Sequence, residues 1–354
     1  MEHIKPDQPV EARQHEVPDV QKLNAWLRSH APHFGEVLSI EQFPSGYSNL
    51  TFCLKTATQE YILRRPPIGA NIKSAHDMGR EFMVLTRLKP HFGKIPSPII
   101  YGEDESVIGA PFYIMQRLQG IILRASHAQQ VKLSPEIFKS ISEALVDTLV
   151  ELHAIDIVKT GLDQLGKPEG YVQRQVEGWI RRYYAAETDS LEHMNQLADW
   201  LKQQQPVSKQ PAFLHNDFKY DNVILDPDDL SNIIGVLDWE MATVGDPLMD
   251  LGASLAYWSE AGDNPVLQSF NLTALPGNLT RQQVVNRYAA KSGRDVSGIH
   301  FYYVFGLLKN AVIAQQIYAR WKQGFSKDPR FGGLIHVIKA LAKQGVESLA
   351  TQKL

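Results

Sequence analysis

The sequence contains Phe213-Leu-His-Asn-Asp-Phe-Lys-Tyr-Asp-Asn-Val-Ile-Leu225 and, after a short connector, Ile233-Ile-Gly-Val-Leu-Asp-Trp-Glu240. Two apolar runs, Val223–Leu225 and Ile233–Leu237, flank the connector Asp-Pro-Asp-Asp-Leu-Ser-Asn, whose residues favour turns. Runs rich in β-branched residues on either side of such a connector predict a β-hairpin. Because the strands of a hairpin are antiparallel, the first strand begins and the second strand ends at the same edge.

Polar side chains gather at that edge of the predicted hairpin. Asn222 and Asp238 should face each other across strands about 4.8 Å apart, and Asp217 lies on the loop that leads into the first strand. An amide oxygen and a carboxylate can share a hard cation. A second carboxylate nearby can orient a hydroxyl group and accept its proton. This set of residues predicts magnesium-dependent phosphoryl transfer.

The run from His215 to Asn222 resembles the catalytic loop of the protein-kinase-like superfamily, in which His-x-Asp is followed by four residues and an Asn. Asp238-Trp-Glu240 stands where protein kinases carry Asp-Phe-Gly. Within the superfamily the sequence is most similar to the aminoglycoside phosphotransferase family, and there to the kinase-like domain fused to some acyl-CoA dehydrogenases. The residues behind this second resemblance are Val236-Leu-Asp-Trp-Glu240 and Gly245-Asp-Pro-Leu-Met-Asp250. The resemblance extends from Val37 to Trp258, and more loosely beyond.

The resemblance implies a role for each residue of the hairpin. Asp217 would be the catalytic base or the group that orients the acceptor hydroxyl, and Asn222 and Asp238 would hold Mg²⁺. Lys219 would neutralise the phosphoryl group during transfer, because the transition state spreads negative charge over its outer oxygens.

Other polar residues are predicted to have structural or supporting roles. His215 and His153 should be structural, packed residues rather than acids, bases or metal ligands. Asp246 and Asp250 should cap a helix or bind the backbone of the catalytic loop. Glu240 would assist a second metal ion indirectly.

Length and composition bound the class of protein. The chain of 354 residues is long enough for two lobes, and 44% hydrophobic residues is ordinary for a globular protein. A formal charge of −3 favours neither nucleic acid nor an anionic membrane as a partner. Cys53 is the only cysteine, which favours a reducing compartment. Since the N-terminus lacks the apolar core of a secretory signal and no apolar run approaches the ~20 residues of a membrane span, we expect a cytoplasmic protein.

The order of the predicted elements indicates an α+β, protein-kinase-like fold with two lobes. Residues 1–18 are predicted to be a flexible tail, residues 19–117 a strand-rich N-lobe that covers the nucleotide, and residues 118–354 a helical C-lobe with the catalytic hairpin. The N-lobe strands are predicted at Val37–Phe43, Leu50–Lys55 and Tyr61–Arg65, with a helix at Ala75–Lys89.

The resemblance also implies ATP and magnesium as cofactors and assigns residues that would bind the nucleotide. In the turn Pro44-Ser-Gly-Tyr-Ser-Asn49, Ser48 and Asn49 would donate to phosphate oxygens. Arg64 stands where kinases place the lysine that grips the phosphates, and Glu81 would pair with it. The backbone from Gln116 to Leu118 would form the hinge that meets the purine.

The segment from Gly170 to Tyr184 indicates the nature of the acceptor. Arg174 and Arg181 are seven residues apart and therefore share one face of a helix, where they would attract phosphates or carboxylates. Flat apolar surface in the same segment would come from Trp179, Tyr183 and Tyr184. We therefore expect a small anionic acceptor with a hydroxyl group, such as a hydroxy acid or a hydroxyacyl-CoA. A solvated basic face with core aromatics, and an aminoglycoside acceptor, are the alternatives.

Two other functional classes share part of this pattern. A pseudokinase would keep the fold and bind a nucleotide or a partner without turnover. Arg64 in place of lysine and the single glycine of the phosphate-covering turn favour it, whereas Asp217, Asn222 and Asp238 favour an active enzyme. A metal-dependent hydrolase needs ligands that activate water, such as paired histidines, which this set lacks.

Overall fold

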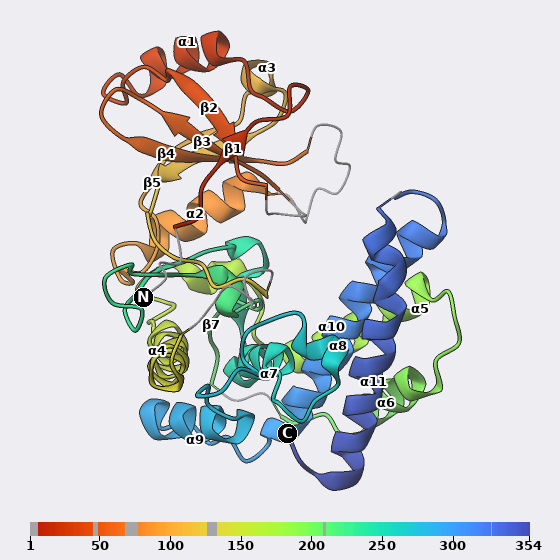
Figure 1. Cartoon of the computed structure of the whole chain (residues 1–354). Helices are drawn as coiled ribbons and strands as arrows, with labels where there is room; N and C mark the ends of the chain where they lie inside the picture. Colours follow the sequence, from red (N-terminus) through yellow and green to blue (C-terminus); the bar gives the residue numbers. More distant parts are fainter. Residues whose placement is uncertain (1–5, 45–48, 68–76, 126–132, 208–209, 327) are drawn as a thin grey trace.

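The computed structural model describes most of the chain. The described residues are 6–44, 49–67, 77–125, 133–207, 210–326 and 328–354. They form an upper lobe rich in strands and a lower lobe built mainly of helices (Figure 1). The two-lobed α+β fold predicted from the sequence is therefore confirmed.

An antiparallel sheet forms the centre of the upper lobe. Its strands run in the order β1-β2-β3-β4-β6-β5. Their bounds are Val10–Glu11 for β1, Ser39–Gln42 for β2, Leu50–Lys55 for β3, Glu60–Arg65 for β4, Pro98–Gly102 for β5 and Phe112–Gln116 for β6. The helices of this lobe are α1 (Val20–His30), α2 (Met78–Leu88) and α3 (Glu105–Ile108).

The alternation of side chains along β4 directs neighbouring residues to opposite faces of the sheet. Leu63 packs in the cluster under α1 and α3, whereas Ile62 packs in the cluster that contains α2 and continues into the lower lobe. Because side chains alternate with a period of two, Arg64 lies on the same face as Ile62. Cys53 on β3 is fully buried. The strand pattern thus places Arg64 on the face towards α2.

The lower lobe surrounds two short pairs of strands with helices. The pairs are β7 (Ala212–Leu214) with β10 (Thr243–Gly245), and β8 (Val223–Leu225) with β9 (Ile233–Val236). The helices are α4 (Pro135–His153), α5 (Tyr171–Ala186), α6 (Glu192–Gln203), α7 (Pro247–Tyr257), α8 (Pro265–Gln268), α9 (Arg281–Ser292), α10 (Ile299–Lys322) and α11 (Leu334–Thr351). Short 3₁₀ turns lie at Leu162–Leu165, Tyr220–Asn222, Trp239–Met241 and Pro329–Gly333.

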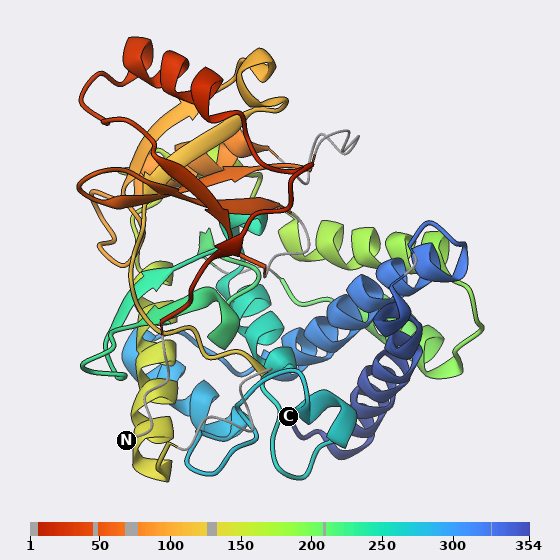
Figure 2. The same cartoon turned by 45° about the horizontal axis from the view of Figure 1, so that its top comes forward.

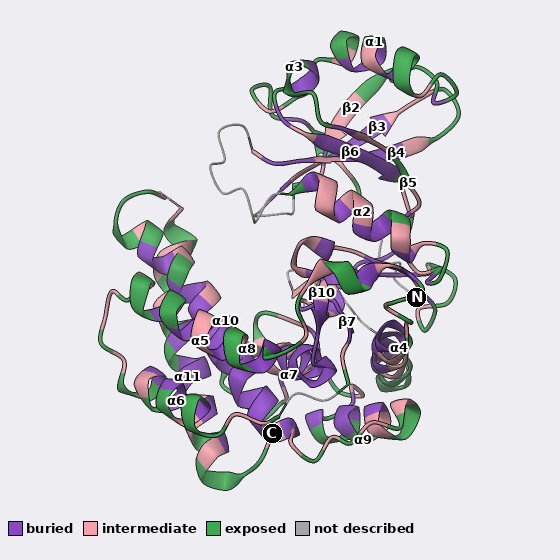
Figure 3. Ribbon diagram, turned by 180° about the vertical axis from the view of Figure 1, so that it is seen from behind, coloured by how far each residue is buried: buried purple, intermediate pink, exposed green. Residues whose placement is uncertain are grey.

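Helix α10 forms the centre of the lower lobe and packs against α5, α6, α7 and α11. Its side chains are buried on nearly all sides over its first five turns, as is most of α7 (Figure 3). Gly306 allows α10 to approach α7 closely, because a Cβ atom there would lie 2.3 Å from the carbonyl oxygen of Gly252. A helix that is apolar all round belongs in the interior of a lobe. In the described part of the chain, no helix has the length and apolar character that crossing a membrane requires.

The predicted hairpin is present as β8 and β9, which pair in antiparallel fashion with Val223 opposite Val236. The edge at which the hairpin begins and ends is closed by a hydrogen bond from the Leu237 N–H to the Asn222 carbonyl, with an N–O distance of 2.8 Å. Asn222 and the residue that follows Leu237, Asp238, therefore lie at one edge, as the sequence predicted.

The described part of the predicted flexible tail, residues 6–18, is a correction to the sequence analysis. Val10 and Glu11 form β1 and pair with β2, and Arg65 donates to the Glu16 carbonyl oxygen at 2.6 Å. Both carboxylate oxygens of Asp7 accept from Arg124, at 2.8 and 3.0 Å. In Figure 2 this segment runs from the lower lobe, near the label N, up to the sheet. Its polar composition indicated a loose tail, but its partners are distant in sequence and could not be inferred locally.

Candidate active site

The loop between β7 and β8 contains the predicted catalytic residues, and α7 fixes its backbone. The carboxylate of Asp250 on α7 accepts from the N–H groups of His215 and Asn216, at 2.6 and 2.8 Å. His153 is buried and its Nε2 lies 3.2 Å from the same carboxylate, while its Nδ1 contacts the Tyr288 hydroxyl at 2.8 Å. The backbone-binding role predicted for Asp250 and the packed, structural role predicted for His153 are confirmed.

His215 has a structural role, as predicted. Its Nε2 lies 2.8 Å from the carbonyl oxygen of Leu237, which connects the catalytic loop to the end of the hairpin. Its Nδ1 accepts from the N–H of Asp217 at 3.2 Å. The imidazole therefore carries its proton on Nε2 and sets the orientation of the following peptide group.

Two residues of the site have left-handed backbone conformations, Asn216 with φ 66° and Asp238 with φ 67°. Such conformations are uncommon for residues other than glycine, and they persist only where surrounding contacts stabilise them. Asn216 has these contacts: its side-chain amide donates to the Met241 carbonyl oxygen at 3.0 Å and lies 3.3 Å from the Tyr171 hydroxyl. Strain of this kind is concentrated at functional sites.

The carboxylate of Asp217 lies between a cation and an amide. Lys219 Nζ is 2.9 Å from its Oδ2, and the side-chain amide of Asn222 donates to the same oxygen, also at 2.9 Å. Burial raises the pKa of Asp217, but the ammonium groups of Lys219 and Lys309 lower it further, so the pKa lies below its ordinary value. Asp217 is therefore ionised at neutral pH, as a proton acceptor must be.

Arg64 connects the two lobes at the site. Its Nη1 lies 3.5 Å from the Glu81 carboxylate on α2, and its Nη2 lies 3.3 Å from the Asp238 carboxylate at the end of the hairpin. The Tyr113 hydroxyl donates to Glu81 at 2.9 Å, which holds that carboxylate in place. Burial lowers the pKa of Arg64, but the carboxylates around it raise the pKa further, well above its ordinary value. The structure thus brings together Arg64 and Glu81, which were predicted to bind the nucleotide, and Asp238, which was predicted to bind magnesium.

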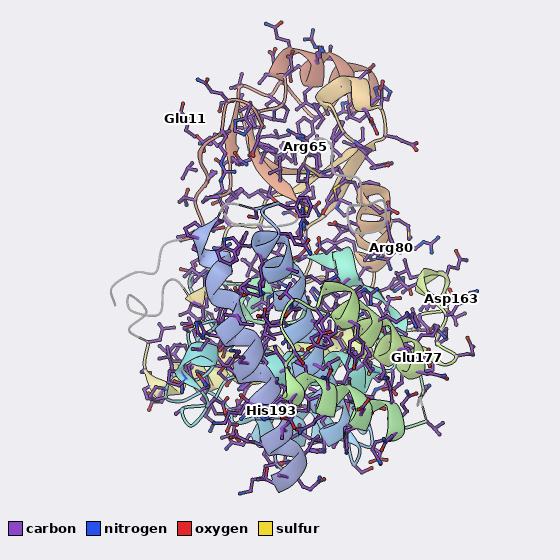
Figure 4. All side chains as sticks on the ribbon, turned by 90° about the vertical axis from the view of Figure 1, so that its right-hand side faces the viewer. Glu11, Arg65, Arg80, Asp163, Glu177 and His193 are labelled. Atoms are coloured by element: carbon purple, nitrogen blue, oxygen red, sulfur yellow. The ribbon has the colours of Figure 1, made fainter. Side chains whose placement is uncertain are left out.

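Asn49 forms a second contact between the lobes. Its side-chain amide donates to Glu81 Oε1 and to Glu240 Oε2, both at 3.2 Å. Burial, together with the charge of Asp238, raises the pKa of Glu240 to about 8. Arg80 on α2, labelled in Figure 4 at the level where the lobes meet, donates to the Glu240 carbonyl oxygen at 3.4 Å. Ser48, which was predicted beside Asn49, lies outside the described residues.

The oxygen donors at the edge of the hairpin suit Mg²⁺. Asn222 and Asp238 offer one amide oxygen and one carboxylate. Within the described residues, no group of three or more His, Cys, Asp and Glu side chains could hold a metal ion. Mg²⁺ does not need such a group, because it is usually bound by one or two protein oxygens together with substrate phosphates and water.

The predicted hinge follows β6, which ends at Gln116. The N–H of Gln116 already donates to the Ser97 carbonyl oxygen at 2.9 Å. The backbone N–H and C=O of Leu118 have no hydrogen bond to any described residue. The side chain of Leu118 lies against β9, where a Cβ atom on Gly235 would be 2.7 Å from Leu118 Cδ1. In this hinge, Leu118 therefore has backbone groups available to a ligand.

The arginines predicted to bind the acceptor lie on the exposed face of α5. Arg174 donates to the carbonyl oxygens of Lys167 and Glu169, and Arg181 Nη1 lies 3.8 Å from the carboxylate of Glu177. Glu177 is labelled on the outer surface in Figure 4. The aromatic residues of the segment differ in solvent exposure: Trp179 and Tyr183 are buried in the core, and Tyr184 is exposed. The expected flat apolar surface therefore reduces to Tyr184.

Two residues of the site, Tyr257 and Lys309, were not predicted from the sequence. Tyr257 on α7 lies under Lys219, whose Nζ is 4.5 Å from the ring centroid. A small pocket of about 20 Å³ beside these two residues is also lined by Trp258 and Phe270. Lys309 on α10 donates to the Asn216 carbonyl oxygen at 2.5 Å. Its only signal in the sequence is a charged residue within the otherwise apolar run Phe301–Leu308 and Ala311–Ala314.

Known proteins resemble most of this chain in sequence and in fold. Residues 39–282 match the family described as phosphotransferase enzyme family. Acyl-CoA dehydrogenase family member 11 of Rattus norvegicus is 34% identical over 337 residues, which are 93% of this chain and 43% of that protein. The human protein of the same name is 32% identical, with the same shares covered. The chain therefore spans less than half the length of the curated relatives it matches.

Solved structures of similar proteins share the fold. The "putative aminoglycoside phosphotransferase" of Ralstonia eutropha JMP134 is 30% identical, with a TM-score of 0.80 over 94% of this chain and 98% of that chain. A thermostable mutant of aminoglycoside phosphotransferase APH(4)-Ia, solved with ADP and hygromycin B, has a TM-score of 0.60 at 16% identity, over 92% of this chain and 98% of that one. The family match covers both the catalytic loop and the Arg64–Glu81 pair. The chain belongs to the phosphotransferase enzyme family.

Proposed function

We propose that this enzyme is a magnesium-dependent kinase that transfers the γ-phosphoryl group of ATP to a hydroxyl group of a small anionic acceptor. The observation that carries the proposal is the position of Arg64, which lies within 3.5 Å of both Glu81 and Asp238. Asp217 and Asn222 share one loop edge with Asp238. Such an arrangement would hold nucleotide phosphates next to a base and two oxygen donors.

The residues would divide the reaction between them. Asp217 would accept the proton of the acceptor hydroxyl on its carboxylate while the hydroxyl oxygen bonds to the γ-phosphorus and the bond to the ADP oxygen breaks. Lys219 would stabilise the negative charge on the transferring group. Asn222 and Asp238 would hold Mg²⁺, which would supply positive charge to stabilise the phosphate oxygens.

Several observations support ATP as the nucleotide. The backbone groups of Leu118, which bind none of the described residues, would suit the edge of a purine, and Arg64 and Asn49, which both contact Glu81, would bind phosphates between the lobes. Structures with the same fold have been solved as complexes with ADP, AMP-PNP or GDP. Guanine and adenine present different hydrogen-bonding groups, so turnover should be compared with ATP and with GTP as the phosphoryl donor.

The acceptor that we propose is a hydroxy compound with a carboxylate or phosphate, such as a hydroxyacyl-CoA. The relatives that match over 93% of this chain are named acyl-CoA dehydrogenase family members, which supports an acyl-CoA-like compound. Arg174, Arg181 and Arg182 form an exposed basic face on α5. Arginine binds carboxylates and phosphates well, whereas a polycationic aminoglycoside would be repelled by such a face.

The test is the release of ADP with each class of acceptor. Purified enzyme with ATP and magnesium should release ADP and form a phosphorylated product with a hydroxyacyl-CoA or a hydroxy acid, and should show little turnover with kanamycin. Arg174→Glu and Arg181→Glu should raise the KM for the anionic acceptor by about tenfold without changing the KM for ATP.

Three results would contradict the proposal in different ways. Robust turnover of kanamycin that these charge reversals leave intact would identify an aminoglycoside kinase. A thermal shift with ATP and magnesium, but no turnover with any acceptor, would identify a pseudokinase. An unchanged acceptor KM in both arginine variants would place the acceptor away from α5.

A further inference from the structure

Lys309 is a buried cation in the middle of α10. The residue is 3% exposed, and Nζ lies 5.8 Å from the ring centroid of Trp179 on α5. The Asn216 carbonyl oxygen, at 2.5 Å, is its one hydrogen-bond acceptor in the described part of the chain, and none of the described carboxylates lies within 4 Å of its Nζ. Burying an ammonium group without a carboxylate partner is costly. A lysine that is buried without a carboxylate partner therefore indicates a specific role.

The carbonyl that Lys309 binds belongs to the peptide group between Asn216 and Asp217. The N–H of the same peptide group donates to His215 Nδ1 at 3.2 Å. Lys309 and His215 therefore hold both ends of one peptide plane. The orientation of that plane sets the direction in which the Asp217 side chain leaves the backbone.

The peptide group needs these two contacts because the backbone of Asn216 is left-handed, with a φ of 66°. Left-handed conformations of residues other than glycine persist only where surrounding contacts hold them, so loss of these contacts should let the peptide group rotate. Asp250 binds the N–H of Asn216, at 2.8 Å, but no other described residue binds its carbonyl oxygen. Lys309 is thus the contact that stabilises the carbonyl side of the turn.

Gln315 is a second buried polar residue on α10, and its contacts are purely structural. It is fully buried, two turns after Lys309, and its side-chain amide donates to the Ala186 carbonyl oxygen at 2.8 Å and to the Thr188 hydroxyl at 3.0 Å. Those partners lie at the end of α5 and after it, and not in the catalytic loop. Gln315 therefore ties α10 to its neighbour, and serves as a matched control for loss of a buried polar group from this helix.

We propose that Lys309 is a positioning residue of the phosphoryl-transfer site: its buried ammonium group fixes the Asn216–Asp217 peptide and thereby aims the carboxylate of Asp217 at the acceptor hydroxyl. This proposal rests on the proposed function in that it takes Asp217 as the base. Lys309 does not touch the nucleotide or the acceptor, and acts through the backbone of the catalytic loop.

The kinetic test separates positioning from general destabilisation. Lys309→Met keeps the length of the side chain and removes the ammonium group, and should lower kcat by about 100-fold with the KM for ATP little changed. Gln315→Met should lower the melting temperature by a similar amount and leave kcat within about threefold. Lys309→Gln, which keeps a donor, should lose about tenfold in kcat and serves as the test if the methionine variant folds poorly.

A second measurement does not depend on turnover. Amide hydrogen exchange of residues 215–217 should become at least about tenfold faster in Lys309→Met, and should stay at the wild-type rate in Gln315→Met. Unchanged exchange in Lys309→Met, or an equal increase in both variants, would overturn the positioning role. If the wild-type enzyme phosphorylates no acceptor, the proposed function fails, and the exchange rates still decide whether Lys309 holds the loop.

Discussion

Arg64 illustrates how much one side chain can determine at this site. A guanidinium group is a planar fork whose two terminal nitrogens can bind different carboxylates. In Arg64 one nitrogen faces Glu81 in the upper lobe and the other faces Asp238 in the lower lobe. A lysine, with a single nitrogen on a flexible stem, could not make both contacts with the same geometry. The arginine therefore joins the two lobes through its two terminal nitrogens.

Removing the Arg64 guanidinium should weaken nucleotide binding. Arg64→Ala is expected to raise the KM for ATP by about tenfold or more, since charge-assisted contacts to phosphate are lost. Arg64→Lys should fall between this variant and the wild type. Arg65→Ala is the control, because Arg65 follows on the same strand, faces the opposite side of the sheet and is labelled in the upper lobe in Figure 4. An equal KM for ATP in the Arg64→Ala and Arg65→Ala variants would show that Arg64 does not contact the nucleotide.

Asp217 should be needed for transfer and dispensable for nucleotide binding. Asp217→Asn removes the proton acceptor and is expected to lower kcat by about 1,000-fold, within the range for a lost general base. The Kd for ADP, measured by calorimetry, should stay the same. Asp226→Asn, at the turn end of the same hairpin, should have wild-type kcat because its partners among the described residues all belong to the turn. Full activity in Asp217→Asn would remove Asp217 from the mechanism.

At the scale of elements, sequence patterns were sufficient for several strands, one helix of the upper lobe and the hairpin. The pattern along Leu50–Lys55 predicted β3, and the helix predicted over 75–89 contains α2. The pair β7–β10 was missed because strands of three residues carry no usable period. Helix α9 was missed although its capping box, Thr280 with Gln283, is visible in the sequence.

The residues of the candidate site also fall into two groups: those that a local sequence motif contains, and those that only the fold brings together. Asp217, Lys219 and Asn222 lie within six residues, so a local motif could group them. The contact between Arg64 and Asp238 joins residues 174 positions apart, and only the resemblance to a known family brought them together in advance. Lys309 and Tyr257 belong to no such motif, because helix packing alone brings them to the loop. Long-range contacts of this kind depend on the whole fold and cannot be inferred from local spacing.

Helix α7 should contribute to acid stability through Asp250. Burial raises the pKa of this carboxyl, but His153 and the backbone of the catalytic loop lower it further, so its folded pKa lies below the unfolded value of about 3.9. The carboxylate therefore stabilises the fold above that pH, and the contribution is lost as the pH falls towards the folded pKa.

This contribution of Asp250 can be measured by urea unfolding of the Asp250→Asn variant and the wild type at several pH values. The variant should be less stable than the wild type by about 3 kcal/mol at pH 7, and the difference should shrink as the pH falls below about 4. Asp163→Asn is the control, since Asp163 is exposed on the surface shown in Figure 4. A stability difference that is constant from pH 7 to pH 3 would show that Asp250 contributes no charge effect.

At the scale of the molecule, two segments connect the lobes. One is the hinge, and the other is the N-terminal segment from Asp7 to Glu11. Asp7 pairs with Arg124, and its carbonyl oxygen accepts from Arg117 at 3.0 Å, while Glu11 lies in the sheet. Because two connections restrict rotation more than one, this segment limits how far the lobes can twist against each other.

Deleting residues 1–11 should loosen the hinge. We expect amide hydrogen exchange of residues 116–121 to become about tenfold faster, because Arg117 and Arg124 lose their partners in the deleted segment. Exchange in α11, which lies far along the lower lobe in Figure 1, should be unchanged and serves as the internal control. Unaltered exchange at the hinge would show that the hinge is rigid without this segment.

The burial of Cys53 makes the chain convenient for optical measurement. Burial raises the pKa of this thiol, so it reacts poorly with maleimide dyes although it is the only cysteine of the sequence. Cysteines introduced at exposed sites, such as Leu38 in the upper lobe and Val158 in the lower lobe, would be labelled selectively in the native protein. Energy transfer between the two dyes would then measure the separation of the lobes in single molecules with and without ATP.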